Sequence, residues 1–538
     1  METSPPAPEV VLADSASADA NPSMPLSPWI RIFNRIFTRN LMSLAMLAAI
    51  TVILSGSLRV PVDLLHDPDL WWHLADARIL TTTHHFIRTE PYSFTVAGNP
   101  WVNPEWASEL VYWIGYSTIG LRGVYVATFL VLFSNVLLIY FRSLWRSGHA
   151  GAAFWATGIG YFLITVNAGA RTIAVAYILM SLEMAILEAA ERGNLRWLWF
   201  LPPLFCIWVN SHGSWLIGLG LFVLYILCGW FPFRKGTFEQ AGFSREVRSK
   251  LLSVLAVSVA VLFINPYGWR LVWNPFDMMM YQKLNIHNVQ EWKPLDLEML
   301  AAKIAVGCLG AVILANCLRS RKWSIFEMAL FAFAWYSAFD HTRFLFMAAV
   351  LTTPILAVEM ERLLFLESDK KTIPVMNMLM VAGAIAFIVH FFPSEDSMQK
   401  GMSETFPMKT IASIQPSWRT LNIDNLGGIM DFEGKPTFLD SRFDTFEHHG
   451  VFKDFLDIMY IRDTYEGLEK YRIDHVLVDA KSSIAYMLLH QPGWKLAQTE
   501  GKGDLSYDLI VRSAAGNANC VPDNQGKPVA KVSDADRP

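Results

Sequence analysis

Residues 104–120 read PEWASELVYWIGYSTIG, and this stretch decides the fold because it can be counted either as a membrane span or as a surface helix. It is apolar, yet it carries Glu105 and Glu109 and is rich in tryptophan and tyrosine. Aromatic side chains gather at the boundary between a bilayer and water, and acidic side chains are costly in the bilayer interior. We therefore interpret the stretch as an interfacial or partly re-entrant helix.

The composition of the whole chain fits a membrane setting. Of its 538 residues, 53% are hydrophobic and 17% are charged, whereas roughly 25% charged residues are usual in soluble domains. The predicted fold class is mostly α, a polytopic membrane protein with about 11 transmembrane helices, each able to cross ~30 Å of hydrocarbon. The apolar runs begin near Leu41, Val124, Gly151, Thr172, Trp197, Ser214, Leu251, Ala301, Ile325, Phe344 and Ile373. No strongly basic face points to a nucleic-acid partner.

Basic residues predict how these runs are oriented. Arg31, Arg35 and Arg39 precede the first run, which places the N-terminus in the cytoplasm by the positive-inside rule. If residues 104–120 do not cross, the other basic loops fall on the same side as the N-terminus. These loops hold Arg142 with Arg146, Arg192 with Arg196, residues 234–250, Arg319 with Arg321 and Lys322, and Arg362 with Lys370 and Lys371. If the stretch does cross, the most basic loop, 233–250, lies outside.

We expect four parts along the chain. Residues 1–28 are rich in Pro, Ala and Ser and form a disordered cytoplasmic tail. Residues 29–392 form the transmembrane domain, whose first external loop is 59–123. Residues 393–513 form a small extramembrane α/β domain, external because an odd number of spans precedes it, and 514–538 form a second disordered tail. We expect strands at 438–439, 475–478 and 507–511, and helices at 451–459 and 464–471.

Asp67-Pro68-Asp69-Leu70-Trp71-Trp72-His73-Leu74, in the first external loop, is the main candidate for chemistry. Asp67 as N-cap and Pro68 as first residue would begin a helix that places Asp69, His73 and Asp76 on one face. A structural cap is one role for Asp67. Asp67 or Asp69 is also a candidate general base, since an acceptor hydroxyl is a weak nucleophile until its proton is removed. Alternatively, Asp67, Asp69 and His73 bind a divalent metal ion as cofactor.

Further charged residues lie at the ends of the apolar runs. Glu105 is either an anchor at the membrane interface or a second catalytic acid. Arg171, His212 and Arg343, together with His73, are candidates for binding a substrate phosphate, which Arg holds through two parallel hydrogen bonds. In the alternative, the two arginines only reach toward water or pair with a nearby acid.

Short motifs are spread along most of the chain. They are Asp67–Leu74, Pro91-Tyr92-Ser93-Phe94, Trp101–Leu110, Asn210-Ser211-His212-Gly213, Asn265-Pro266-Tyr267-Gly268, Glu291-Trp292-Lys293-Pro294 and Phe438-Leu439-Asp440-Ser441-Arg442. With the acidic, Trp-rich first loop and the terminal domain, they resemble a bacterial branch of the GT-C superfamily of integral-membrane glycosyltransferases. This branch is similar to protein O-mannosyltransferase-like and dolichyl-phosphate-mannose-type proteins. The resemblance covers most of residues 30–515.

The resemblance implies a function that the residues alone do not. It implies transfer of a sugar from a polyprenyl-phosphate-linked donor, here an undecaprenyl-phosphate-linked one, with inversion at the anomeric carbon. The active site would lie on the external, periplasmic face of the bacterial inner membrane. In this superfamily the first external loop supplies the catalytic acid, and the matching positions are Asp67 and Asp69. Many members have an adjacent acidic pair, whereas Pro68 separates the two here, so which Asp acts and whether a metal is needed stay open.

Two other classes of function remain. A membrane transporter would use acidic residues within the bundle, such as Glu183 and Glu188. A non-catalytic membrane scaffold for cell-envelope assembly would bind through Asp440, Arg442 and Asp444 in the C-terminal domain. The acceptor, whether glycan, lipid or protein, is not predicted.

Overall fold

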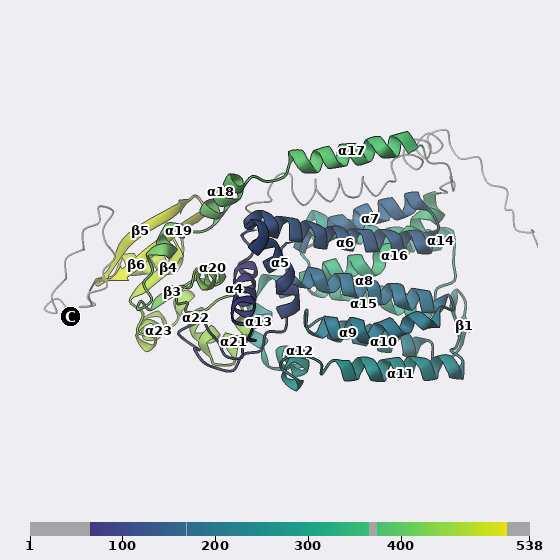
Figure 1. Cartoon of the computed structure of the whole chain (residues 1–538), viewed down its shortest axis with the longest axis horizontal. Helices are drawn as coiled ribbons and strands as arrows, with labels where there is room; N and C mark the ends of the chain where they lie inside the picture. Colours follow the sequence, from purple (N-terminus) through teal and green to yellow (C-terminus); the bar gives the residue numbers. More distant parts are fainter. Residues whose placement is uncertain (1–64, 168, 365–373, 514–538) are drawn as a thin grey trace, which may run out of the picture.

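The computed structural model describes residues 65–167, 169–364 and 374–513 (Figure 1). The two predicted tails, the apolar run near Leu41 and the basic residues that precede it lie outside the described residues. Figure 1 shows a bundle of helices lying side by side, with a smaller region of strands and short helices at one end.

The bundle helices coincide with the predicted apolar runs from Val124 onward. They are α6 (Leu121–Ser147), α7 (Ala150–Ile164), α8 (Thr172–Glu191), η3 (Leu195–Phe200) with α9 (Leu201–Val209), α10 (Trp215–Cys228), α11 (Arg245–Val261), α14 (Leu300–Leu318), α15 (Ile325–Asp340), α16 (Leu345–Leu364) and α17 (Pro374–His390). Among the described residues, four helical segments are long and apolar enough to cross a membrane: 121–147, 172–191, 300–318 and 342–363. The chain is thus a mostly helical, multi-pass membrane protein, but helix length alone does not yield about 11 spans.

One end of the bundle holds a network of arginines and glutamates. There Arg142 binds Glu188 at 2.9 Å, and Arg146 binds Glu327 at 2.7 Å. Arg321 bridges Glu327 and Glu359, and the small hairpin of β1 (Phe233–Lys235) and β2 (Phe238–Gln240) lies at the same end. Because these ion pairs join α6, α8, α15 and α16, they tie the bundle together at this end.

The opposite end carries α4 (Pro68–Thr83) and α5 (Trp106–Ile119), which run across the bundle axis (Figure 1). The 14 residues of α5 reach about 21 Å, short of the ~30 Å hydrocarbon thickness. α5 turns directly into α6, and Gly115 and Gly123 let their backbones touch, since a Cβ on Gly123 would lie 1.7 Å from the Gly115 oxygen. The same end holds α12 (Trp269–Tyr281), α13 (Lys283–Asn288), η4 (Gln290–Trp292) and η5 (Thr342–Phe344).

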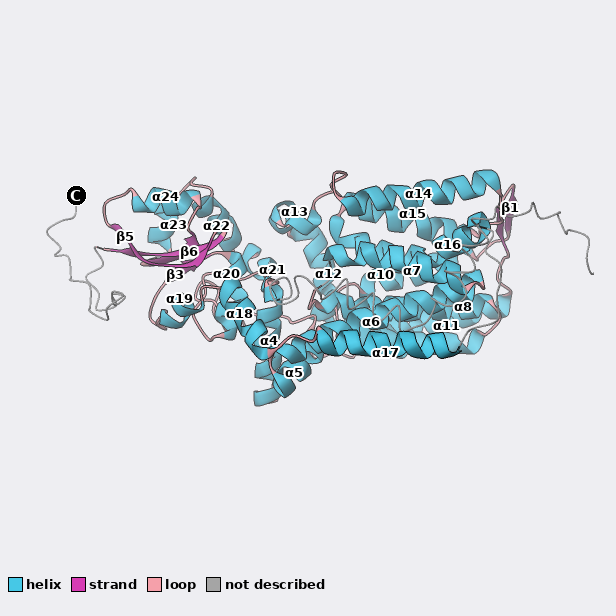
Figure 2. Cartoon of the chain, turned by 90° about the horizontal axis from the view of Figure 1, so that it is seen from above, coloured by secondary structure: helices cyan, strands magenta, loops and turns pink. Residues whose placement is uncertain are grey.

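The C-terminal region contains a four-stranded sheet in the order β3-β4-β6-β5. β3 (Thr420–Asn422) is parallel to β4 (His475–Asp479), while β6 (Leu505–Arg512) is antiparallel to both β4 and β5 (Trp494–Lys502). Figure 2 shows helices on both faces of this sheet. They are α18 (Glu395–Thr405), α19 (Met408–Ser413), α20 (Asp424–Phe432), α21 (Phe443–Glu447), α22 (Val451–Met459), α23 (Thr464–Lys470) and α24 (Ser483–Leu489).

The strands predicted at 475–478 and 507–511 and the helices predicted near 451–459 and 464–471 are confirmed. The strand predicted at 438–439 is wrong. That segment instead runs beside the first loop, where Thr437 forms one isolated bridge with Ser93 and the Phe94 N–H donates to the Thr437 oxygen. Its apolar residues are buried by packing on the first loop, so the pattern resembles that of a buried strand.

The C-terminal region and the first loop share one hydrophobic core. Trp71 of α4 is fully buried, and its ring lies 5.7 Å from that of Phe406 and 5.5 Å from that of Phe432. Gly428 in α20 lets the two helices meet, because a Cβ there would lie 2.2 Å from the Pro68 oxygen. The candidate residues of the first loop are therefore held between the bundle and the C-terminal region.

Candidate functional site

Asp67 begins α4, as the sequence predicts. Its carboxylate accepts the backbone N–H of Asp69 at 3.1 Å, and Pro68 is the first helical residue. The second carboxylate oxygen of Asp67 accepts a hydrogen bond from Nε of Arg171. Because both oxygens are occupied and the residue is buried, Asp67 is bound to the scaffold on both sides.

Asp69 lies one residue into the helix and is only partly buried. Its Oδ1 accepts hydrogen bonds from the Ser441 hydroxyl and, at 3.2 Å, from Nε1 of Trp72. Among the described residues, Oδ2 of Asp69 has no hydrogen-bond partner. One oxygen is therefore fixed and the other is free to meet a ligand.

His73 faces two glutamates. Its Nδ1 lies 3.0 Å from Oε1 of Glu109, and its Nε2 lies 3.5 Å from Oε2 of Glu105. The ring is 2% exposed, so a ligand would reach it only after the surrounding residues move. The side-chain amide of Asn103 donates to both oxygens of Glu109, at 2.9 and 2.8 Å, so Asn103 belongs to the same cluster.

Glu105 connects this cluster to the bundle. Its Oε2 accepts the Thr172 hydroxyl at 2.6 Å, and its Oε1 lies 3.3 Å from Nε2 of His212. The Nδ1 atom of His212 accepts the Ser214 N–H at 2.9 Å, so the neutral ring carries its proton on Nε2, facing Glu105. His212 is thus placed as a donor toward Glu105.

Burial shifts the proton affinity of these groups. It raises the pKa of Glu105 to about 7, against the opposing effects of His73 and the Thr172 hydroxyl. Burial also raises the pKa of Glu109 to about 8, although Asn103 and Arg442 act in the other direction. Burial lowers the pKa of His212 to about 3, with Arg343 and His73 adding repulsion. At neutral pH, His212 is therefore uncharged, and each of the two glutamates is present in both its protonated and its ionised form.

Two arginines lie near the aspartates. Arg171 binds Asp67 through Nε and Glu291 through Nη1. The guanidinium carbon of Arg343 lies 4.2 Å from the centre of the Trp292 ring, and no ion pair joins Arg343 to any residue that the structure describes. Arg343 lies within electrostatic range of Arg171, Glu105 and Asp69. Arg343 is therefore a cation without a carboxylate partner, within electrostatic range of Asp69.

The predicted metal set does not converge. Asp67 turns to Arg171, Asp69 to Ser441, and His73 to Glu109. Within the described ranges, no group of three or more His, Cys, Asp or Glu side chains has an arrangement that could hold a metal ion. The geometry of these three residues does not fit a shared ion, and no catalytic step is derived through one.

Arg442 supports the site from the C-terminal region. It binds Glu90 at 2.9 Å and Asp440 at 2.6 Å, and its guanidinium lies 4.7 Å from the centre of the Trp101 ring. All three charged residues are buried. Asp440 and Arg442 therefore do not form the exposed binding edge that a scaffold would require.

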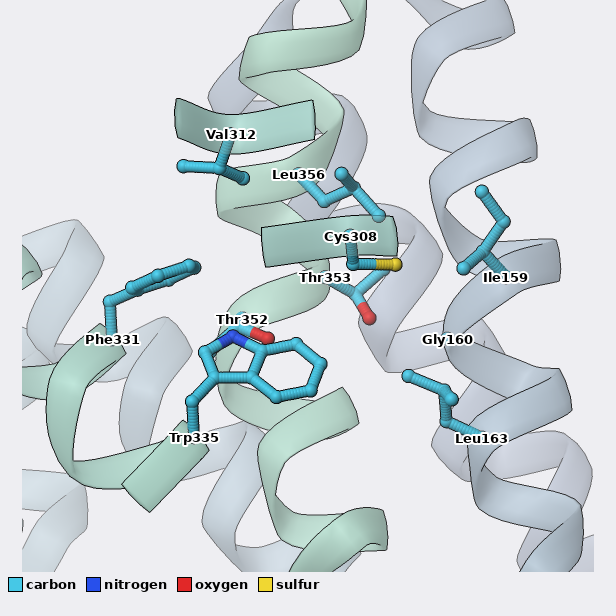
Figure 3. Close-up of a pocket in the computed structure, with 10 residues that line it drawn as sticks. All are labelled: Ile159, Gly160, Leu163, Cys308, Val312, Phe331, Trp335, Thr352, Thr353 and Leu356. Carbon is cyan, nitrogen blue, oxygen red and sulfur yellow. The ribbon is translucent and has the colours of Figure 1, made fainter. Parts of the chain in front are cut away.

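Two voids lie outside this cluster. The first, drawn in Figure 3, lies between α7, α14, α15 and α16 and measures about 10 Å³, room for one water at most. The second, of about 300 Å³, lies behind α4 and is lined by Trp71, Tyr116 and Phe432 among others. Trp71 and Asp69 are two positions apart, so they face different sides of the helix, and this cavity does not open on Asp69.

The fold resembles solved membrane transferases. Archaeal oligosaccharyltransferase AglB from Archaeoglobus fulgidus, in complex with an inhibitory peptide and a dolichol-phosphate, aligns with a TM-score of 0.50 at 10% identity over 84% of this chain and 70% of AglB. This likeness shows that the chain shares its fold with AglB.

Two further solved structures are similar. ArnT from Cupriavidus metallidurans, bound to undecaprenyl phosphate, aligns with a TM-score of 0.49 at 13% identity over 90% of this chain and 98% of ArnT. Arabinofuranosyltransferase AftD from Mycobacteria aligns with a TM-score of 0.47 at 11% identity over 92% of this chain and 40% of AftD. No protein-family model matches the sequence. No curated protein matches it either.

The fold thus brings all seven predicted site residues to one end of the bundle. Sequence reasoning missed the residues that hold them, chiefly Ser441, Asn103 and Thr172. Ser441 and Asn103 belong to motifs that the sequence singles out, but nothing in a single sequence pairs Ser441 with Asp69 across 372 positions.

Proposed function

We propose that this protein transfers a sugar from a polyprenyl-phosphate-linked donor to an acceptor hydroxyl or amide, with Asp69 as the general base. The observation that carries the proposal is the free Oδ2 of Asp69, close to two arginines at one end of a GT-C bundle. The bound dolichol-phosphate in the AglB complex supports a polyprenyl phosphate as the lipid carrier.

Asp69 suits the role of base better than Asp67. The oxygens of Asp67 are taken by a backbone N–H and by Arg171, so Asp67 would have to break a contact to accept a proton. Asp69 accepts a proton on Oδ2 without losing either of its donors. A base must reach the proton that it removes, so this geometric difference supports Asp69 over Asp67.

Arg343 and Arg171 are proposed to receive the phosphate. Arg343 has no carboxylate to displace among the described residues, and Arg171 uses Nε and Nη1 but has no described partner on Nη2. In the transfer, the acceptor proton moves to Asp69 and the acceptor atom bonds to C1 of the sugar. The bond from C1 to the phosphate oxygen breaks, and the arginines stabilise the departing phosphate.

Glu105 is proposed to tune this reaction rather than to act as the base. Both oxygens of its carboxylate contact neighbouring side chains, those of His73, Thr172 and His212, whereas Oδ2 of Asp69 has no partner among the described residues. Since its pKa is raised to about 7 by burial, it changes charge near neutral pH. Because the charge of Glu105 acts on Arg343, this change alters the electrostatic potential at Arg343.

We further propose a periplasmic site in the bacterial inner membrane, with about 11 spans, a cytoplasmic N-terminus and an external C-terminal region. Two groups of charge support this orientation. The buried arginine network lies at one end of the bundle, and the acids, histidines and C-terminal region lie at the other. The positive-inside rule assigns the first end to the cytoplasm.

A transporter is the alternative that one observation favours. Glu183 in α8 is fully buried, and neither of its carboxylate oxygens has a hydrogen-bond partner in the structure. Buried acids in membrane helices often mark ion pathways. Glu188, by contrast, belongs to the network with Arg142 and Arg146.

The proposal is tested with protein purified in mild detergent. Lipid that copurifies is identified by mass spectrometry, and transfer of radiolabelled sugar from a polyprenyl-phosphate-sugar donor is measured in native membranes. We expect a polyprenyl phosphate to copurify, and transfer to be lost in Asp69→Asn but retained in part in Asp67→Asn. Full transfer by a folded Asp69→Asn variant would show that Asp69 is not the base, and absence of any bound polyprenyl lipid would favour the transporter.

A further inference from the structure

We infer that Ser441, in the C-terminal region, is a positioning residue that fixes the carboxylate of Asp69 through a hydrogen bond. This inference rests on the proposed function, in which Asp69 is the base. It makes the C-terminal region a direct part of the reaction site.

The contact is built from two donors on one oxygen. Oδ1 of Asp69 accepts the Ser441 hydroxyl and Nε1 of Trp72, and the same indole nitrogen lies 3.1 Å from the Ser441 oxygen. A partly exposed carboxylate otherwise rotates about its last side-chain bond. Holding Oδ1 leaves Oδ2 as the oxygen that meets the acceptor, which is the kind of orientation that accelerates proton transfer.

The residues on either side of Ser441 in the chain are held in place by hydrogen bonds and an ion pair. On one side, the hydroxyls of Ser93 and Thr95 donate to the Phe438 oxygen at 3.0 and 2.7 Å. On the other side, the backbone N–H of Arg442 donates to Asp440 at 2.8 Å, and its guanidinium binds Glu90. The Ser441 hydroxyl has no other acceptor among the described residues, so its contact with Asp69 is not shared.

The chemistry predicts a specific effect on pH dependence. A hydroxyl that donates to a carboxylate stabilises the ionised form, which is the form a general base needs. The other charged groups near Asp69 are Asp67, Glu105, Arg171, Arg343 and Asp424. None of these is altered in a Ser441 variant, so a change in the pH profile reports on the lost hydrogen bond.

The experiment compares Ser441→Ala, Ser441→Thr and Thr95→Val. Thr95→Val is the matched control, because it removes a hydroxyl that holds the same segment without touching Asp69. Transfer from a radiolabelled polyprenyl-phosphate-sugar is measured over a range of pH. We expect Ser441→Ala to slow transfer about tenfold and to move the acidic limb of the profile up by about one pH unit. Ser441→Thr should restore most of the rate, and Thr95→Val should leave the limb in place.

A Ser441→Ala profile that matches that of Thr95→Val, or a Ser441→Thr variant no faster than Ser441→Ala, would overturn the inference. Failure of the proposed function looks different, since wild-type protein would then transfer no sugar. In that case an infrared titration of the Asp69 carboxyl, identified by its loss in Asp69→Asn, decides. A titration midpoint that is the same in wild type and Ser441→Ala contradicts the contact.

Discussion

Asp67 binds Arg171 across 104 positions of the sequence through one carboxylate oxygen. Its other oxygen accepts the backbone N–H of Asp69, so both oxygens have a partner. Asp69, two residues further on, keeps one oxygen open. The two acids that the sequence could not tell apart are therefore separated by their partners. Asp67 joins the first loop to the bundle, and Asp69 keeps one oxygen without a partner among the described residues.

This separation predicts different defects in two conservative variants. Asp67→Asn keeps a good helix cap but loses the ion pair with Arg171, so we expect the unfolding free energy to fall by about 1–3 kcal/mol while some transfer remains. Asp69→Asn should unfold at nearly the wild-type temperature and transfer no measurable sugar. Thermal unfolding in detergent and the transfer assay measure the two effects on the same samples. The opposite pattern, an inactive but stable Asp67→Asn, would exchange the two roles.

Arg343 should matter for lipid binding more than for folding. It makes no ion pair with the described residues, so Arg343→Gln should leave the unfolding temperature nearly unchanged. A hydrogen bond to a charged group contributes about 1.5–3 kcal/mol, so affinity for undecaprenyl phosphate should fall about 10- to 100-fold. Arg88→Gln is the matched control, because Arg88 lies at the same end but donates to the Pro266 oxygen. Equal binding by both variants would remove Arg343 from the phosphate site.

The buried glutamates predict how stability depends on pH. Glu109 loses its proton near pH 4.5 in an unfolded chain but has a pKa of about 8 when folded, and Glu105 behaves similarly with a pKa of about 7. The folded protein thus holds more protons over this range, so stability should fall as pH rises from about 5 to 8. Glu109→Gln should make the unfolding temperature fall less steeply as pH rises. Glu404 is an exposed residue on α18, so Glu404→Gln should leave this fall unchanged. If unfolding temperature falls equally with pH in wild type, Glu109→Gln and Glu404→Gln, Glu109 is not the group responsible.

Replacing each of two glutamates that lie five positions apart on α8 should affect stability differently. Glu188 pairs with Arg142 in a buried network, and Glu188→Gln leaves that arginine without its partner, at a cost of about 3–5 kcal/mol. Glu183 has no hydrogen-bond partner among the described residues, so Glu183→Gln should be neutral or stabilising and should leave sugar transfer intact. Unfolding temperature and transfer rate are read together. Loss of transfer in a stable Glu183→Gln variant would favour the transporter.

Much of the fold follows from local patterns. Helix α4 begins at Pro68 because Asp67 and Pro68 are a strong start signal, and the predicted apolar runs from Val124 onward are helical because their composition persists for many residues. The short strands β3 and β5 were missed. β3 has only three residues, and β5 is largely exposed at the sheet edge, so neither shows a hydrophobic pattern.

The site was predicted as a set of residues but not as a set of contacts. The aspartates, histidines and arginines were found because charged residues are rare at the ends of apolar runs. Their partners could not be found, since Ser441 and Glu291 lie far from Asp69 and Arg171 in the sequence. Both belong to motifs noted in the sequence, but a single sequence does not show which residues pair. The metal hypothesis fitted the residue types of Asp67, Asp69 and His73, and only their orientation in space shows that each turns elsewhere.

The ion pair between Glu90 and Arg442 also has a consequence for biosynthesis. The two residues are 352 positions apart in the sequence, and both are buried. The first loop emerges from the ribosome long before Arg442 is made, so until then Glu90 has no cation to offset its charge. We therefore expect the first loop to take its final packing only after Arg442 has been synthesised.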